Sequence, residues 1–228
     1  MNVFKKVFFD DLRDIDSGEV FQDMIFEKCS FMSCSFSYTS DVHKRSKARK
    51  ITFKNCEQKN CQLFGGILED IEIENLATHN ILWSKGTFFK HVTLKGKMGR
   101  MVLSNETALC FGEEVRSNFI LANENLYKEV DWCLDISGAV FKELDIRGVP
   151  AKYIIRNPDN QVVITKESLK NADLSRVDFK GTYFKTAIGL FRDSYFEDTI
   201  LTAPMMRKDS GKYLEVLDQL VKEGIAYR

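Results

Sequence analysis

The sequence lacks long hydrophobic runs and has no excess of either charge. No stretch reaches the run of about 18 apolar residues that indicates a membrane-spanning helix. The N-terminus leads into Asp10 and Asp11 instead of an apolar signal core. The 33 basic and 33 acidic residues balance, so nothing favours nucleic acid or an anionic membrane as a partner. We expect a cytoplasmic protein without a membrane span, although a secreted effector delivered by a specialised system would leave no mark in such a sequence.

Motifs for catalysis and cofactor binding are also missing. The sequence contains no G-x-x-x-x-G-K-(S/T), G-x-G-x-x-G or G-x-S-x-G. Its three histidines lie in no H-E-x-x-H or similar motif, and we expect them on the surface: His43, His79 and His91. A nucleophilic Cys–His pair stays open, because its members meet only in space. The sequence predicts no catalytic residue, no cofactor and no enzyme activity.

Six cysteines are spread along the chain, and we expect reduced, buried thiols. Two pairs, Cys29 with Cys34 and Cys56 with Cys61, could be taken for halves of a zinc site, which needs four converging ligands. Both pairs, however, share the spacing of a repeat that runs through the sequence. That repeat explains them as small interior residues, so no metal site is predicted.

A five-residue repeat is the main positive signal. Phenylalanine occurs 18 times and recurs at every fifth position from Phe21 to Phe36, with small or apolar residues such as Cys29 and Cys34 two places earlier. The same spacing, with Phe, Leu or Ile at most central positions, recurs over 51–73, 87–94, 134–146, 169–184 and 189–201. A period of five fits neither an α-helix nor a plain strand. It predicts a chain that turns a corner every five residues and whose stacked coils pair as strands.

Particular units of this repeat resemble those of a known family. The segment 172–176, Ala-Asp-Leu-Ser-Arg, is similar to the A-(D/N)-L-x-x unit of pentapeptide-repeat proteins. The segments 29–31 and 34–36, both Cys-Ser-Phe, resemble its common variants. The resemblance implies an all-β fold, a right-handed quadrilateral β-helix with Phe and Leu stacked inside. Such a motif indicates architecture and not function.

Departures from the repeat divide the chain into four parts of one continuous domain. We expect an N-terminal stack over 1–94 with an insertion loop at 37–50, and an irregular, strand-rich section over 95–133 that interrupts the β-helix. A second stack is expected over 134–203. The last part, 204–228, is predicted to hold a short capping helix, because Tyr213 and Leu217 fall at helical spacing. In relatives of the resembled family such a helix also joins two copies, so a homodimer through it is an alternative to capping alone.

A basic run over 43–50 is the best functional candidate by charge. It contains five residues that could bind phosphate or an acidic partner: Lys44, Arg45, Lys47, Arg49 and Lys50. The simpler interpretation is a solvated loop, because runs of charge are usually soluble surface.

Three functions follow from this interpretation. The first is a non-enzymatic, rigid scaffold that binds a protein partner of unknown identity, such as a bacterial effector or protective factor would be. The second is a DNA mimic that inhibits or protects DNA gyrase or another topoisomerase, as the resemblance implies, and it needs a continuous acidic face. The third is an enzyme on the irregular section, where five polar residues offer side chains without a marked spacing: Asn105, Glu106, Glu113, Glu114 and Asp131.

Overall fold

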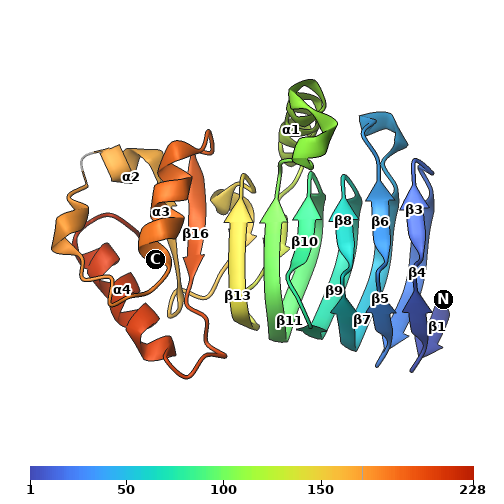
Figure 1. Cartoon of the computed structure of the whole chain (residues 1–228), viewed down its shortest axis with the longest axis horizontal. Helices are drawn as coiled ribbons and strands as arrows, with labels where there is room; N and C mark the ends of the chain where they lie inside the picture. The colour runs from blue at the N-terminus through green and yellow to red at the C-terminus, as the bar shows by residue number, and fades with distance from the viewer. Residues whose placement is uncertain (171) are drawn as a thin grey trace.

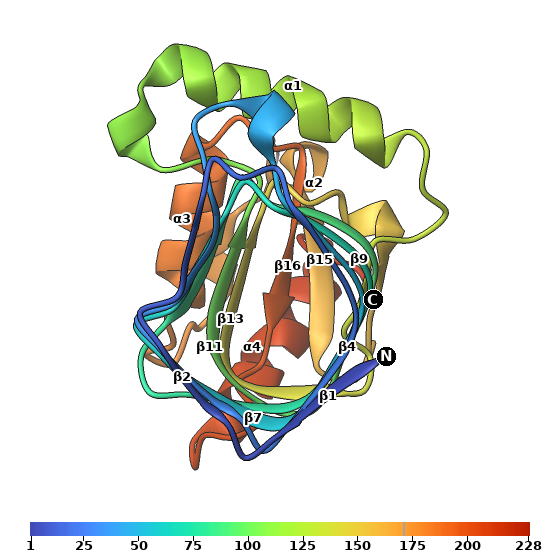
Figure 2. The same ribbon diagram turned by 90° about the vertical axis from the view of Figure 1, so that its right-hand side faces the viewer.

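The computed structural model describes residues 1–170 and 172–228. The N-terminal part of the chain forms a large parallel sheet, and the C-terminal part forms a smaller unit of helices with two antiparallel strands beside it (Figure 1). Helix α1 leaves the sheet between these parts and lies across one side of it (Figures 1 and 2).

The large sheet has 14 strands, and its main hydrogen-bonded path has the order β1-β4-β7-β9-β11-β10-β8-β6-β3. The strands are β1 (Asn2–Lys5), β2 (Phe8–Asp10), β3 (Arg13–Ile15), β4 (Val20–Glu27), β5 (Ser30–Met32), β6 (Ser35–Tyr38), β7 (Lys47–Lys59), β8 (Gln62–Phe64), β9 (Ile67–Thr78), β10 (Leu82–Lys85), β11 (Phe88–Ser104), β12 (Leu134–Asp135), β13 (Ala139–Arg147) and β14 (Ile154–Ile155). The pairs are parallel, and the sheet curls through 252° into an open half-barrel (Figure 2).

Left-handed backbone conformations produce the bends of the sheet. Asn55, Asn60 and Gly65 follow each other at five-residue intervals with φ of 52°, 56° and 66°. Asn and Gly enter this region more readily than most residues. The same conformation recurs at Lys6, Asp11, Asp16, Asp23, Lys28, Ser33, Asp70, Asn75, Gly86, His91 and Gly96. Each of these residues redirects the extended chain, so a long strand such as β7 contributes to successive sides of the half-barrel.

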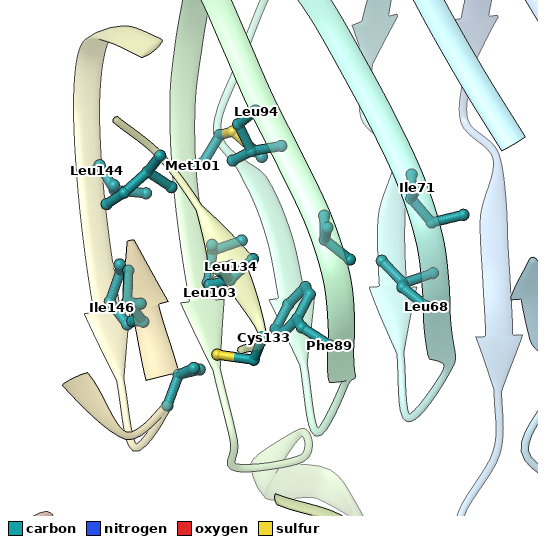
Figure 3. Packing of buried hydrophobic residues seen from close by; sticks show 14 of the residues in the cluster. Leu68, Ile71, Phe89, Leu94, Met101, Leu103, Cys133, Leu134, Leu144 and Ile146 are labelled. Carbon is teal, nitrogen blue, oxygen red and sulfur yellow. The ribbon is translucent and has the colours of Figure 1, made fainter. Parts of the chain in front are cut away.

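The concave side of the sheet is filled with aromatic and aliphatic side chains. Phe26 stacks between Phe4 and Phe53, with both ring centroids 5.0 Å away. Further along the sheet aliphatic side chains pack beside buried rings such as Phe89, as at Leu94 and Leu103, which are both 2% exposed (Figure 3). Offset and edge-on ring contacts stabilise such a stack beyond the burial of its area.

The open side of the half-barrel is spanned by loops and helices. The 3-10 helices η1 (Val42–Lys44) and η2 (Leu109–Phe111) and the helix α1 (Glu113–Tyr127) lie there (Figure 2). Phe119 of α1 is fully buried. Asn123 of α1 donates to the carbonyl oxygen of Gly86 over 3.2 Å, which ties the helix to the end of β10. The chain departs from the sheet at these insertions, which all lie on one side, and the strands do not close into a barrel there.

The C-terminal unit has its own core. Its strands β15 (Gln161–Thr165) and β16 (Asp198–Thr202) pair antiparallel. Its helices are α2 (Lys166–Lys170), α3 (Phe184–Asp193) and α4 (Ser210–Lys222), with the 3-10 helix η4 (Leu174–Arg176), while the 3-10 helix η3 (Ala151–Tyr153) precedes β14. Phe184 and Ile188 of α3 pack with Val216 and Leu220 of α4, and all four are fully buried.

The expected all-β, right-handed quadrilateral β-helix is wrong. The fold is mixed α/β, and its parallel sheet is an open, strongly curled half-barrel. The error is greatest in the expected second stack at 134–203. There the repeat positions Leu169, Leu174 and Phe184 lie in α2, η4 and α3 instead of strands. A five-residue spacing of apolar residues therefore also occurs in helices and turns that pack on one core.

The helix expected within 204–228 is present as α4, and it supplies Tyr213 and Leu217 to the core of the C-terminal unit. Another expectation needs revision. The segment 95–133, expected to be irregular and strand-rich, contains the end of β11 and then η2 and α1.

Candidate functional site

The basic run does not form one exposed patch. Lys44 is exposed at the end of η1, whereas Arg45 is only 7% exposed. Lys47, Arg49 and Lys50 belong to β7, so the expected insertion loop at 37–50 covers parts of two strands and is shorter in the structure. The five predicted binding residues therefore point to different surroundings.

Arg45 has a structural environment. Its guanidinium donates to the carbonyl oxygens of Gly65, Gly66 and Gly86, the last two over 3.2 and 3.3 Å. The guanidinium carbon lies 5.4 Å from the centroid of the Phe119 ring. Burial lowers the pKa of Arg45 to about 10. Arg45 thus joins the loop at 39–46, two turns of the sheet and α1, and it is not available to a partner.

Arg49 belongs to a row of alternating charges on the outer face of the sheet. Arg49, Glu69 and Lys90 lie in register on β7, β9 and β11, and the carboxylate of Glu69 is 3.4 Å from Arg49 and 3.1 Å from Lys90. A second row places Lys5, Glu27, Lys54, Glu74 and Lys95 in register on successive strands. Exposed pairs of this kind contribute little stability, but they neutralise the outer face.

A groove of about 680 Å³ lies on the outer side of β3, β6, β8 and β10. The segment at 108–110 borders it from the open side of the half-barrel. Its lining combines a polar floor with aromatic and cationic residues: Arg13, Ile15, Ser33, Cys34, Ser35, Tyr38, Asn60, Gln62, Phe64, Lys85, Ala108 and Cys110.

An aromatic cluster stabilises the wall of this groove. The Tyr38 ring lies edge-on to the rings of Phe64 and Phe111, at centroid distances of 4.9 and 5.4 Å. The ammonium of Lys85 lies over the rings of Phe64 and Trp83, at 5.6 and 5.1 Å. A cation held over aromatic faces is oriented without being neutralised by a carboxylate.

The chemistry of the groove suits an extended acidic segment. Lys85 supplies positive charge, whereas the charge of Arg13 is paired with Asp11 over 2.7 Å. Ile15 on the lining is 53% exposed, and Cys110 is exposed as well. Aromatic side chains with a few cations are typical of protein-binding surfaces. No motif in the sequence marks this surface. Phe64 and Lys85 lie on the outer face because each directly follows a residue that points inward, Leu63 and the buried Ser84.

A second hollow of about 420 Å³ lies between β13 and α3. Its carboxylates are paired within the chain: Glu106 accepts from Arg116 over 2.9 Å, and Asp145 accepts from Arg147 over 2.8 Å. Tyr183 donates its hydroxyl to the carbonyl oxygen of Thr202 over 3.2 Å, and burial raises its pKa. The pairing leaves these groups in structural roles between the sheet and the C-terminal unit.

The other polar residues of the 95–133 section are divided between distant contacts. Asn105 accepts from Asn123 over 2.5 Å beneath α1, and Glu113 accepts from Arg116 over 2.8 Å. Glu114 is exposed at the start of α1. Asp131 contacts His91, far along the sheet from these groups. Of the residues from which an active site on this section was considered, the structure brings only Glu106 and Glu113 together, and there Arg116 pairs with both carboxylates.

His91 lies between two carboxylates on the surface. Its Nε2 is 2.7 Å from Asp131 and its Nδ1 is 3.2 Å from Asp70. The ring of Trp132 lies 4.7 Å from the imidazole. The hydrogen bond to Asp131 raises the pKa of His91 more than burial lowers it. The arrangement ties the connection after α1 to β9 and β11, and the sequence does not show it because the three groups come from separate segments.

The cysteines considered as halves of a zinc site donate hydrogen bonds from their thiols to backbone carbonyl oxygens of neighbouring strands. Cys29 donates to the carbonyl oxygen of Phe4 over 3.4 Å, and Cys61 donates to that of Phe31 over 3.4 Å. Burial raises the pKa of Cys61 to about 11. Over the described residues, no three His, Cys, Asp or Glu side chains are grouped so that they could hold a metal ion.

Helices α1 to α4 are each too short or too polar to cross a membrane, as judged from the described part of the chain. Comparison with protein-family models gives no match, and comparison with curated proteins gives none either. The resemblance to pentapeptide-repeat proteins is therefore wrong as an assignment, because no family model supports it and the sheet is an open half-barrel.

Proposed function

We propose that this protein is a non-enzymatic scaffold that binds a protein partner, and that an extended acidic segment of the partner occupies the groove over β3, β6, β8 and β10. The observation that carries the proposal is the ammonium of Lys85, which lines the groove and is held over the rings of Trp83 and of the buried Phe64. Aromatic residues and cations of this kind dominate the binding energy of many protein interfaces.

The rigidity of the surface supports the same proposal. The groove lies on strands that are hydrogen-bonded in register, with Ser35 opposite Gln62 and Gln62 opposite Trp83. A surface that is already ordered loses little conformational entropy when a partner binds. The packing of Tyr38 between Phe64 and Phe111 fixes the wall in the same way.

The two alternatives receive less support. A DNA mimic needs a continuous acidic face, whereas the outer face alternates in sign along the rows through Glu69 and Glu74. An enzyme needs polar groups that converge on a reacting atom, whereas Glu106 and Asp145 are each held by an arginine.

Site-specific crosslinking tests the groove. Cys110 lines it and is exposed, so a thiol-reactive photocrosslinker placed there should capture the partner from a lysate of the native host. The matched control is Cys110→Ser with Lys50→Cys, which carries the crosslinker on the basic run. We expect an adduct from Cys110 and none from position 50.

Charge reversal completes the test. Lys85→Glu should abolish the adduct at Cys110, whereas Lys50→Glu, which reverses an exposed cation of the basic run, should leave it unchanged. Circular dichroism confirms that both variants are folded. Capture that survives Lys85→Glu, or that is lost with Lys50→Glu, contradicts the assignment of the groove.

A further inference from the structure

The two ends of the parallel sheet differ in whether other elements of the chain cover them. At the C-terminal end, Thr199 donates to the carbonyl oxygen of Ile146 over 2.9 Å and Gln161 donates to that of Ile136 over 3.3 Å. The C-terminal unit thus covers the last strands of the sheet (Figure 1). At the N-terminal end, β1, β2 and β3 pair on one side only within the described chain, with β4, β5 and β6. An uncovered edge of this kind is a template for strand pairing.

Apolar side chains gather at the uncovered end. Of the 13 exposed large hydrophobic residues of the described chain, six lie within the first 20 residues: Met1, Val3, Phe8, Leu12, Ile15 and Val20. Phe8 on β2 is 58% exposed and Leu12 is 54% exposed. Soluble proteins usually protect an edge with charge or cover it, so an exposed apolar edge indicates an interaction surface.

The charges around β2 are self-complementary. Lys6 precedes the strand and Asp10 ends it, and both are exposed. Their neighbours Lys5 and Asp11 are already paired within the chain, with Glu27 over 2.9 Å and with Arg13 over 2.7 Å. When two copies of one strand pair antiparallel, the residues before the strand in one copy lie beside the residues after it in the other. Lys6 of each copy would therefore meet Asp10 of the other.

We propose that the chain forms a twofold-symmetric dimer in which β2 pairs antiparallel with β2 of a second copy. The interface is isologous, so each charge contact occurs twice. Pairing brings Phe8 of each copy towards the other and joins the two half-barrels end to end. The strand β2 contributes no residue to the lining of the groove, although Ile15 of the uncovered end does.

Sedimentation velocity over a series of protein concentrations tests the dimer. The wild type should sediment as a dimer, whereas Lys6→Glu and Asp10→Lys, each of which places like charges opposite each other twice, should raise the dissociation constant by about tenfold or more. Lys128→Glu, a reversal at an exposed position directly after α1, is the matched control and should leave the dimer unchanged.

Mixing the two variants gives the decisive measurement. In a mixed dimer Glu introduced at position 6 of one copy faces Lys introduced at position 10 of the other, and the native Asp10 faces the native Lys6. The equimolar mixture should therefore dimerise although neither variant does alone. Circular dichroism confirms folding, and Phe8→Ala provides a second variant that weakens the dimer without a charge change.

Three outcomes overturn the proposal. The first is a wild type that stays monomeric at every concentration. The second is an equimolar mixture of the two variants that stays monomeric. A dimer that persists in both charge variants places the interface elsewhere. Failure here is distinguishable from failure of the proposed function, because monomeric Lys6→Glu should still give the crosslink at Cys110.

Discussion

Replacement of Arg45 by Met tests whether this residue of the basic run stabilises the fold or binds a partner. The guanidinium donates to three carbonyl oxygens, of Gly65, Gly66 and Gly86, and is buried against Phe119. Methionine keeps much of the apolar stem but removes every donor. The carbonyl oxygens would then be buried without their present partner, which is the costly part of such a change.

The expected magnitude follows from two opposing contributions. Hydrogen bonds from a charged donor stabilise by about 1.5–3 kcal/mol each, so the three together would contribute roughly 4.5–9 kcal/mol if they were additive. Burial lowers the pKa of Arg45 from 12.5 to about 10, which corresponds to a desolvation cost of about 3 kcal/mol that methionine does not carry. We therefore expect Arg45→Met to lower the free energy of unfolding by about 3 kcal/mol.

Urea denaturation followed by circular dichroism at pH 7 measures this change. Lys44→Met is the matched control, because Lys44 is the exposed neighbour of Arg45 and should change the free energy of unfolding by less than about 0.5 kcal/mol. Arg45→Lys should also destabilise, since one ammonium does not span carbonyl oxygens on two turns of the sheet. Arg45→Met with wild-type stability but without partner capture would refute the structural role and restore the basic run as a binding site.

Two further predictions concern titratable groups. Cys110 should be the first thiol to react with Ellman's reagent, because it is exposed, whereas Cys61 and Cys133, whose pKa burial raises to about 11 and about 12, should react only on unfolding; loss of the fast phase in Cys110→Ser checks the assignment. The raised pKa of His91 means that its contacts with Asp131 stabilise the fold fully below the ordinary histidine pKa of 6.5 and that this contribution is lost as the pH rises through the raised value. His91→Gln should remove that part of the pH dependence of unfolding, and a wild type with the same pH profile as the variant would show that the contact is not coupled to folding.

The sequence predicted which residues line the interior of the sheet better than it predicted the architecture of the fold. Phe26 and Phe31, found from the five-residue spacing, do pack against the concave core. The spacing succeeds there because a left-handed residue follows these central positions by two places, as Lys28 follows Phe26 and Ser33 follows Phe31. The prediction of a closed, four-sided solenoid was wrong because the repeat does not show that insertions span one side of the sheet.

The C-terminal part failed for a related reason. Leu174 and Phe184 keep the spacing, but Arg176 and Thr186 occupy the places where the sheet has its bends. A β-branched residue such as Thr is poorly suited to a left-handed conformation. The residue two places after the central position therefore carries information that the apolar pattern lacks.

The groove was missed because its residues come from four strands and a loop. Tyr38, Phe64 and Lys85 are far apart in the sequence, and only the parallel register brings them to one face. Arg45 was misjudged for the opposite reason, since its charged neighbours in sequence do not share its surroundings. A run of charged residues in the sequence does not show which of them are buried. Arg45 is buried because the loop turns its side chain towards the carbonyl oxygens of Gly66 and Gly86.

If left-handed residues cause the curl, glycine should act in opposite ways at bends and within strands. Lys28 is an exposed lysine at a bend with φ of 54°, and Lys59 is an exposed lysine in β7. A left-handed conformation costs a residue with a side chain about 1–2 kcal/mol, whereas glycine loses about 0.5–1 kcal/mol of chain entropy on folding.

Lys28→Gly should therefore raise the free energy of unfolding by about 0.5 kcal/mol, and Lys59→Gly should lower it by about 0.5–1 kcal/mol. Lys28→Val should destabilise by more than about 1 kcal/mol, because a β-branched side chain resists the bend. Urea denaturation of the three variants decides the matter. Equal losses for glycine at both positions would mean that the bends follow from the packing of the core and not from the conformation of single residues.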